Sequence, residues 1–282
     1  MMQELIINTQ EMLSYSFIVR AMIVGALVSL CSALLGVNLV LKRYAVIGNG
    51  ISDVAYGAIS AAVAFGWAPI PITISISILA SVLLMKLGNN SKLKSDSAIA
   101  ILGSSSLAFG TAATSITTGL NTDVCNYMFG SILAMSKEDV YLSIAVSIVV
   151  ILLYSILYHN LFMVTFDEDF ARAGGIRVGL YNNLIAVLTA VTIVIGMRLM
   201  GTLLISSIII FPALTSMRIF KNYRSVVIVS AGISIITFFI GIYLSYLYSI
   251  STGAMIVLTN LAAFLLAMAV EKMKGAKKYY AT

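Results

Sequence analysis

Long apolar runs recur along almost the whole sequence, and they constrain its fold more than any other feature. A helix of about 20 apolar residues is long enough to cross the hydrocarbon core of a bilayer, which is roughly 30 Å thick. With 60% hydrophobic and only 10% charged residues, the chain is far more apolar than a soluble globular domain. The sequence therefore predicts an all-α integral membrane protein, a polytopic helical bundle that forms a single transmembrane domain over residues 1–282.

We predict eight to nine transmembrane helices in this bundle. Their approximate ranges are 16–41, 46–66, 70–87, 97–118, 140–158, 182–199, 200–217, 225–248 and 251–271. The stretch 182–217 is apolar almost throughout, but a single helix of that length would be longer than the membrane is thick. We therefore place a turn in the run Gly196–Gly201, where glycine permits a tight backbone and Arg198 can reach the lipid headgroups.

The basic residues are distributed unevenly between the two sides of the predicted bundle. Of the 17 basic residues, all but Arg20, Lys137 and Arg198 fall in alternate connections or in the C-terminal tail. By the positive-inside rule these connections are cytoplasmic, so nine spans are expected, with the N-terminus outside and the C-terminus inside a prokaryotic plasma membrane. The net charge of +6 follows from this bias, so contact with membrane lipid explains it and a nucleic-acid partner is not expected.

The sequence lacks the common motifs of ATP hydrolysis and proteolysis. It contains no G-x-x-x-x-G-K-[ST] phosphate loop and no H-E-x-x-H, and its one histidine is His159. We expect no enzyme activity and no bound cofactor in this chain. If the protein pumps a substrate, the energy must come from a gradient or from a partner.

An aspartate interrupts the second apolar run, in the segment IGNGISD. Asn49 and Asp53 are four residues apart and so share one helical face, and Asp53 lies about 15 Å beyond the basic pair at 42–43, close to the membrane midplane. An ionisable group at that depth is by default a functional-site hypothesis. The alternative is that Asp53 hydrogen-bonds Ser52, Tyr56 or a freed backbone group and only locks the bundle.

The segment FDEDFARAGG, within the connection at about 166–179, predicts a short helix outside the membrane. Asp167 can cap the helix, the two acids after it lie at its positive N-terminal end, and the pair Gly174–Gly175 can stop it. Phe166 and Phe170, four residues apart, are expected to share one face. An acidic helix start would be repelled by an anionic membrane surface, so a docking site for another protein is favoured over a helix that lies on lipid.

Glycines and one proline within the apolar runs favour close packing. Gly48, Gly50 and Gly57, and the pair Gly175 and Gly179, are predicted to let helices approach one another closely. Pro212 removes one hydrogen bond from its helix, and the resulting kink serves either gating or packing. We therefore predict that Gly57 and Pro212 are gating or structural residues.

The motifs together resemble one family. VLKRYAVIGNGISDVAYGAIS resembles the second-span motif of the permease subunits of zinc and manganese ABC importers, which is close to VLRR-x-x-x-IGD-x-x-SH-x-x-x-G. The segment Asn126–Leu133, followed by Ser136–Asp139, is similar to the LFG-x-x-L outer loop, and FDEDFARAGG is similar to the FD-x-x-FA-x-x-x-G coupling segment. Gly201–Leu204 through Phe211–Ala213 is similar to the seventh-span signature. The resemblance extends over about residues 16–271.

The resemblance implies a membrane-spanning subunit that moves a divalent metal ion into the cytoplasm, with zinc or manganese as the expected metal and iron as a further candidate. It also implies a homodimer of this chain, two cytoplasmic ATP-binding subunits that use ATP, and an extracytoplasmic metal-binding protein. The residues expected to couple the chain to the ATPase are Phe166, Asp167, Glu168, Phe170, Ala171 and Gly174. The family places aspartate and histidine where this chain has Asn49 and Asp53, so the carboxylate is displaced by one turn.

Asn49 and Asp53 from two copies of the chain would offer a divalent ion two carboxylates and two amide oxygens. Oxygen ligands suit manganese better than zinc, whose protein sites usually include nitrogen or sulfur. The alternative function is a secondary transporter or channel in which Asp53 carries a proton or a sodium ion. Such a protein is expected to contain an internal repeat, and the sequence shows no second copy of the IGNGISD stretch.

Overall fold

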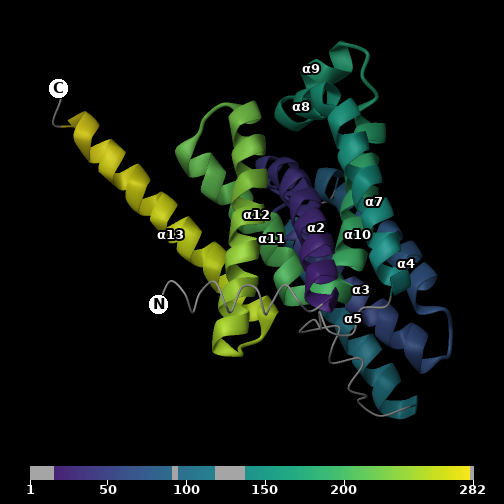
Figure 1. Cartoon of the computed structure of the whole chain (residues 1–282). Coiled ribbons are helices and arrows are strands. Elements are labelled where there is room, and N and C mark those ends of the chain that lie inside the picture. Colours follow the sequence, from purple (N-terminus) through teal and green to yellow (C-terminus); the bar gives the residue numbers. More distant parts are fainter. Residues whose placement is uncertain (1–15, 91–94, 118–136, 280–282) are drawn as a thin grey trace.

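The computed structural model describes residues 16–90, 95–117 and 137–279, and these residues form a bundle of helices without any strand (Figure 1). The helices are α2 (Ser16–Leu41), α3 (Ile47–Ala64), α4 (Pro69–Asn90), α5 (Ser95–Thr117), α7 (Lys137–Ile156), α8 (Tyr158–Phe166), α9 (Glu168–Ala173), α10 (Val178–Met200), α11 (Thr202–Ile219), α12 (Tyr223–Tyr248) and α13 (Thr252–Tyr279). The predicted all-α class is confirmed. The outer-loop motif expected at Asn126–Leu133 lies outside the described residues.

Eight helices in the described part of the chain are long and apolar enough to cross a membrane. The exception among the nine predicted spans is α3, in which Asn49 and Asp53 interrupt the apolar sequence. Most of α3 is nevertheless buried, because it packs against α4, α5, α10 and α11. Each predicted range coincides with one long helix, and the largest difference is at α13, which continues past residue 271 to Tyr279.

The turn predicted between residues 196 and 201 is present, and it consists of one residue. Gly201 alone joins the end of α10 to the start of α11, with φ 84° and ψ 161°, a conformation that is open to glycine. Arg198 in the last turn of α10 does not simply extend toward headgroups, as expected, because its guanidinium forms an ion pair with the Asp139 carboxylate of α7. This pair joins two helices at the end of the bundle that includes the α10–α11 turn.

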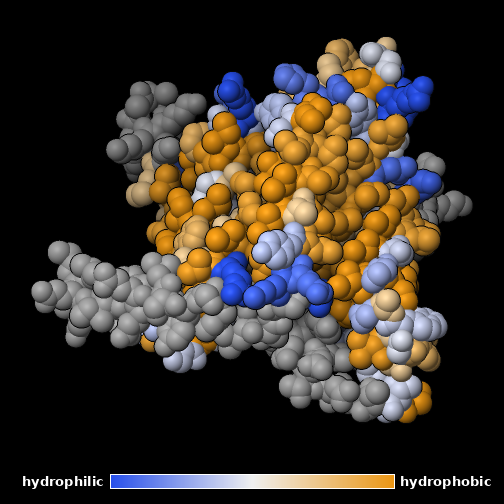
Figure 2. All heavy atoms as spheres, turned by 45° about the vertical axis from the view of Figure 1, so that its right-hand side comes forward, coloured by the Kyte–Doolittle hydropathy of each residue, from blue (hydrophilic) through white to orange (hydrophobic). Residues whose placement is uncertain are grey.

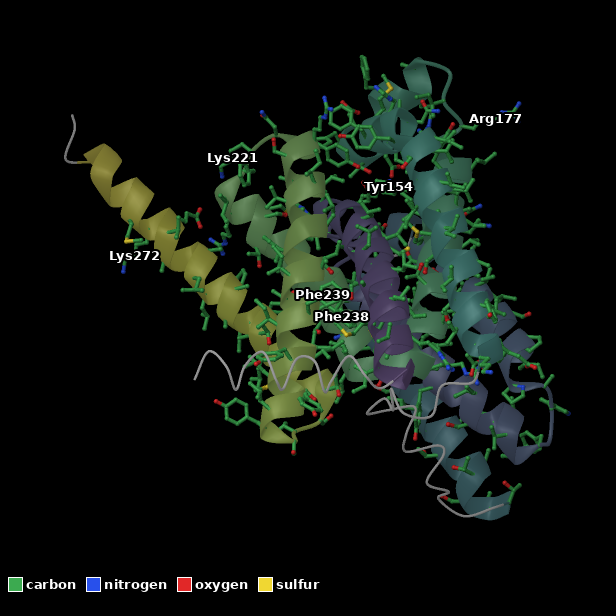
Figure 3. The ribbon with its side chains drawn as sticks, in the orientation of Figure 1. Tyr154, Arg177, Lys221, Phe238, Phe239 and Lys272 are labelled. Carbon is green, nitrogen blue, oxygen red and sulfur yellow. The ribbon has the colours of Figure 1, made fainter. Side chains whose placement is uncertain are left out.

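The helix α2 lies at the centre of the bundle and packs against α7, α8, α10, α11 and α12 (Figure 1). Two glycines bring its neighbours close. A Cβ atom added at Gly25 would lie 2.0 Å from the ring of Phe238, and one added at Gly36 would lie 2.0 Å from the carbonyl oxygen of Ile209. Phe238 is completely buried and lies in the middle of α12, in the interior of the bundle (Figure 3). The absence of side chains at these two positions therefore lets α11 and α12 pack directly on α2.

The helices α3 and α5 meet along four glycines, which we call the glycine seam: Gly50 and Gly57 of α3, and Gly103 and Gly110 of α5. A Cβ atom at Gly57 would lie 2.2 Å from the carbonyl oxygen of Ser106, and one at Gly110 would lie 2.7 Å from the Cα of Gly57. Real Cβ atoms do not approach backbone so closely, so the two helices are in direct backbone contact. The close approach predicted at Gly50 and Gly57 is confirmed. It is wrong at Gly48, where an added Cβ atom would make only an ordinary contact, 3.5 Å from the Ile209 side chain.

The same prediction is wrong for the pair Gly175 and Gly179, where an added Cβ atom would meet nothing within 4 Å. Gly175 instead has φ 82°, and it reverses the chain after α9. Pro212 is buried within α11, which packs against both α2 and α3, and its gating role stays a prediction.

The surface of the bundle has the distribution expected of a membrane protein. Figure 2 shows a broad hydrophobic band across the middle of the molecule, with hydrophilic residues toward its upper end and in a second group below the band. Large apolar side chains in this protein remain exposed, including Ile116 at 85%, Ile156 at 74% and Leu79 at 69%. In water such a surface would drive association, whereas lipid tails cover it without cost. At the upper end, α8 and α9 form a small protrusion with Arg177 nearby, which we call the lobe (residues 158–177; Figures 1 and 3).

The glycine seam predicts a stability difference between two otherwise identical substitutions. Gly57→Ala places a methyl group inside the Ser106 backbone, so we expect a loss of about 1–3 kcal/mol in folding free energy. Gly232→Ala in α12 is the matched control, because a Cβ atom there meets nothing within 4 Å. Thermal unfolding of the purified variants in detergent measures the effect. An unchanged melting temperature for Gly57→Ala would show that α3 and α5 are not in backbone contact.

Candidate metal site and docking lobe

Asn49 and Asp53 lie one turn apart in the first half of α3, as the sequence predicted. Asn49 is exposed and Asp53 is half-buried, although nearly all other residues of α3 from Ile47 to Ala62 are buried. The exposed strip of this helix in a single chain therefore carries its two most polar side chains. The glycine seam positions Asp53 within this strip. The Asp53 Oδ2 atom lies against Gly103 of α5, and a Cβ atom added at Gly103 would be 3.1 Å from it.

The hydrogen bonds near Asp53 do not support its interpretation as a structural lock. Ser52, one of the expected partners, donates its hydroxyl to the backbone carbonyl of Asn49 at 2.8 Å. Within the described part of the chain, neither the Asp53 carboxylate nor the Asn49 side-chain amide forms a hydrogen bond. Their oxygen atoms are therefore free to accept a ligand.

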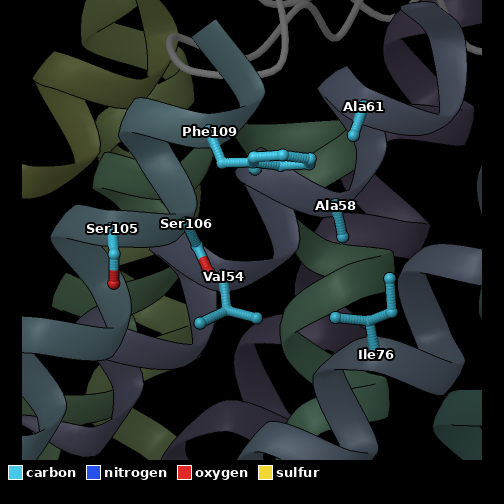
Figure 4. Close-up of a pocket in the computed structure, with 8 residues that line it drawn as sticks. Val54, Ala58, Ala61, Ile76, Ser105, Ser106 and Phe109 are labelled. Atoms are coloured by element: carbon cyan, nitrogen blue, oxygen red, sulfur yellow. The ribbon is translucent and has the colours of Figure 1, made fainter. Parts of the chain in front are cut away.

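A groove of about 270 Å³ lies between α3, α4 and α5, and its lining on α3 begins at Val54, the residue after Asp53 (Figure 4). Its lining residues are Val54, Gly57, Ala58, Ala61, Ile76, Ser105, Ser106 and Phe109. The groove is largely apolar, with the hydroxyls of Ser105 and Ser106 and nearby backbone as its polar groups. Gly57 lies both in this groove and in the glycine seam, so the packing of α3 on α5 also shapes the groove.

One chain supplies few metal ligands at this place. No group of three or more His, Cys, Asp or Glu side chains is close enough to hold an ion among the described residues. A carboxylate and an amide provide at most two or three oxygen ligands, whereas Mn²⁺ prefers an octahedral set of oxygen ligands. The two side chains that the sequence predicted lie one turn apart on α3, and together they offer fewer oxygen atoms than such a set requires.

The lobe contains the helix that the sequence predicted in FDEDFARAGG. The Asp167 carboxylate caps α9 by accepting a hydrogen bond from the Phe170 amide at 2.9 Å, and Gly174 and Gly175 end the helix, as expected. Ala171 is buried with Val164 and Val178 in a small apolar cluster beneath the lobe. The α9 residues that the sequence predicted to couple to the ATPase therefore belong to a helix that is packed against the rest of the protein.

The expectation that Phe166 and Phe170 share one helical face is wrong. α8 ends at Phe166, and Asp167 has an extended conformation with φ −148° and ψ 100°, so the two rings belong to different helices. Phe166 packs on the rings of Phe162 and Tyr223, with centroids 4.9 and 5.8 Å away. Phe170 is 63% exposed, so it is the aromatic side chain that α9 presents at the surface.

Glu168 faces inward, which the sequence did not indicate. Its Oε1 atom accepts a hydrogen bond from the Lys42 ammonium at 2.8 Å and one from the Asn182 amide at 3.0 Å. The Lys42 side chain is only 5% exposed, so its charge depends on this partner. Burial alone would lower the pKa of the ammonium, and Glu168 opposes that shift.

The pKa of Glu168 reflects the same contacts. Burial raises it, but the hydrogen bonds from Lys42 and Asn182 and the charges of Lys42 and Arg172 more than compensate, so the pKa lies below its ordinary value. The stabilisation that this carboxylate provides is complete above the ordinary pKa of glutamate and is lost as the pH falls through the lowered value. At neutral pH the Glu168 carboxylate is therefore ionised.

A helical bundle with a membrane-facing surface, an open polar strip on an interior helix and a folded lobe at one end has the architecture of a transport permease. Residues 14–271 match the ABC 3 transport family, so the chain belongs to this family.

Relatives match over nearly the full length of the chain. The manganese import system permease protein ScaB of Streptococcus gordonii is 30% identical over 265 residues, which cover 94% of each chain. The manganese transport system membrane protein MntC of Halalkalibacterium halodurans is 26% identical over 270 residues, covering 96% of this chain and 92% of that protein. Among solved structures, PsaBC from Streptococcus pneumoniae in complex with Fab superposes with a TM-score of 0.82 at 28% identity, covering 95% of each chain.

The family resemblance inferred from the sequence is thus confirmed. The chain is a multi-pass permease subunit of an ABC transporter and not an enzyme, as expected. The alternative of a secondary transporter or channel is excluded by the family to which the chain belongs.

Proposed function

We propose that this permease imports a divalent metal ion and that Asn49 and Asp53 are its ligands on the transport path. The observation that carries the proposal is the open strip of α3, where both side chains have free oxygen atoms although they lie within a membrane-spanning bundle. Leaving a carboxylate unpaired at such a place is costly, so a function that requires it is the simplest reason for its presence. The metal import named for the relatives above supports the same conclusion.

Among divalent metals, manganese fits these ligands best. Asn49 and Asp53 contribute only oxygen atoms, which suit Mn²⁺, while zinc sites usually recruit imidazole or thiolate. Iron shares some of this preference and is the second choice. A transport site must also release its ion, so moderate ligation is appropriate.

A homodimer would complete the site. Two copies related by a twofold axis, with their α3 strips facing each other, would present two carboxylates and two amide oxygens to one ion. The exposure of Asn49 in a single chain supports this arrangement, because a second copy could cover it.

The other proposed partners are ATP-binding subunits and a metal-binding protein. It carries no phosphate loop and is expected to bind no cofactor, so two cytoplasmic ATP-binding subunits would use ATP and dock on the lobe through Phe170. An extracytoplasmic metal-binding protein would deliver the ion to the opposite end. The lobe and the C-terminus would then be cytoplasmic and the N-terminus outside, in a prokaryotic plasma membrane.

Substitutions of Asp53 test the metal site. Asp53→Ala should abolish uptake of radiolabelled manganese in cells while the protein stays folded and membrane-inserted, since removal of an unpaired charge relieves a desolvation cost. Asp53→Asn keeps the shape but removes the charge and should also lose most uptake. The double variant Asn49→Asp/Asp53→His should retain transport and shift preference toward zinc. Full manganese uptake by Asp53→Asn would contradict the site.

Substitution of Phe170 tests docking. Phe170→Asp places a charge at the centre of the proposed contact, so ATP hydrolysis should no longer drive uptake in the assembled transporter. Phe220→Asp is the matched control, because Phe220 is also partly exposed but lies in the α11–α12 connection, outside the lobe. Equal ATP-driven uptake by the two variants and the wild type would rule out docking through Phe170.

Cysteine labelling tests the orientation. Asp169→Cys lies on the lobe, where the native carboxylate is 94% exposed, and Ser251→Cys lies in the exposed turn between α12 and α13, at the other end of the bundle (Figure 1). A membrane-impermeant thiol reagent applied to intact cells should label the Ser251→Cys variant and not the Asp169→Cys variant. Labelling of Asp169→Cys from outside would reverse the proposed orientation.

A further inference from the structure

Asn38, in the last turn of α2, and Lys42, the residue that follows this helix, hold the lobe to the centre of the bundle. They are four residues apart, and the Lys42 amide still donates to the Asn38 carbonyl at 3.0 Å, so the two side chains lie on one face. Both are buried, Asn38 completely and the Lys42 side chain to all but 5%. Each forms its hydrogen bonds with residues far away in the sequence, and each contacts a different helix of the lobe.

Asn38 connects α2 to α8. Its side-chain oxygen accepts hydrogen bonds from the Thr165 hydroxyl of α8 at 3.2 Å and from the Tyr223 hydroxyl of α12 at 2.7 Å. Its side-chain amide donates to the Tyr154 hydroxyl of α7 at 3.2 Å. Three helices therefore meet at one buried amide, and Tyr154 lies just below the lobe (Figure 3).

Lys42 connects α2 to α9 and α10. The ammonium donates to Glu168 of α9 and to Asn182 of α10, and the Asn182 amide donates to the same Glu168 oxygen. The three side chains form a closed set of hydrogen bonds around a buried charge. Displacing α9 without moving the end of α2 would expose or unpair the Lys42 ammonium, which costs more than a shift of the two helices together.

The end of α2 is in turn joined rigidly to α3. Arg43 has φ 63°, and the backbone amides of Arg43 and Tyr44 donate to the carbonyls of Val40 and Leu39 at 3.0 and 2.8 Å. These two bonds form a Schellman motif, which fixes the direction of the chain after the helix. Tyr44 is largely buried, and the Ile47 amide at the start of α3 donates to its carbonyl at 3.0 Å. A short, hydrogen-bonded connection thus separates Lys42 from Asn49.

We propose that the Lys42–Glu168 pair is a coupling element: it carries movement of the docked lobe through the end of α2 to the metal site on α3. Lys42 and Glu168 are positioning residues, since neither touches the metal. The inference rests on the proposed function, because it takes the lobe as the docking site for the ATPase and α3 as the transport helix. It changes the role of Glu168 from a docking residue to an internal connection.

The competing explanation is that the pair only stabilises the fold. A double-substitution experiment separates the two roles. Glu168→Gln leaves the buried Lys42 ammonium without its charged partner, and Lys42→Met leaves the partly exposed Glu168 carboxylate without its own, so both should lower the melting temperature, the first more than the second. The double variant Lys42→Met/Glu168→Gln removes both charges and should recover most of that stability. A purely structural pair would then also recover transport, whereas a coupling pair would not.

The measurement uses the complete transporter, with its ATP-binding subunits and binding protein, in proteoliposomes with radiolabelled manganese. We expect uptake per ATP hydrolysed to fall about fivefold in the double variant, while its melting temperature stays close to that of the wild type. Asp169→Asn is the matched control, because Asp169 lies next to Glu168 on α9 but forms only an exposed pair with Arg172 at 3.5 Å. It should leave uptake per ATP unchanged.

The outcomes are distinct. Unchanged uptake per ATP in the double variant, or a loss that only follows the loss of stability, would overturn the coupling role. Equilibrium binding of manganese to the purified variants should equal that of the wild type, and a loss of binding would also overturn it. If the proposed metal site is wrong, the Asp53→Asn variant keeps full uptake, whatever the Lys42–Glu168 variants do. The two proposals can therefore fail independently.

Discussion

A polar group inside a hydrocarbon layer must find a partner within the protein, and the arrangement of this bundle depends on that requirement. Asn38 meets it by joining α2 to α7, α8 and α12, and Lys42 meets it through Glu168. Because Asn38 lies in the last turn of the central helix and Lys42 directly follows that helix, satisfying them fixes the lobe and the neighbouring helices around α2. Asp53 differs from both, since it forms no hydrogen bond within the described part of the chain.

The charge of Asp53, and not its lack of a hydrogen bond, is what distinguishes it. Buried hydroxyl oxygens such as those of Ser29, Ser60 and Tyr243 also lack a hydrogen-bond partner among the described residues. An ionisable group in a membrane-spanning bundle is far more costly than a hydroxyl, so Asp53 is by default a functional-site hypothesis. It lies on α3, one residue before the lining of the groove between α3, α4 and α5 begins.

Local patterns predicted most of the fold. The apolar runs gave each long helix within a few residues, and the turn at Gly201 and the cap at Asp167 followed from the local chemistry of those residues. Contacts between distant residues could not be predicted in this way. The charge pattern correctly marked Lys42 as a basic residue at the end of a span, but its pairing with Glu168, 126 residues away, has no local signal. The relative placement of Phe166 and Phe170 was misjudged because Asp167, in an extended conformation, separates α8, which ends at Phe166, from α9, which contains Phe170.

The candidate site was identified from the free-energy cost of placing an ionisable side chain in the membrane, and not from a contact between residues. An aspartate near the midplane is expensive whatever surrounds it, so Asp53 could be singled out from the sequence alone. The tight packing that holds it against α5 could be predicted only in part, because Gly50 and Gly57 suggest a close neighbour without saying which helix it is.

The glycine seam has a mechanical consequence. Most helix pairs interlock through ridges and grooves of side chains, and one helix cannot travel along the other without repacking them. The seam of α3 and α5 has glycine at positions seven residues apart on both helices. Backbone faces backbone at Gly57 and Gly110, whereas the side chains of Ile99 and Asp53 pack on Gly50 and Gly103. A small axial shift of α3 would therefore meet side chains at one end of the seam and bare backbone at the other. Such a shift would change what the Asp53 carboxylate faces without unfolding either helix.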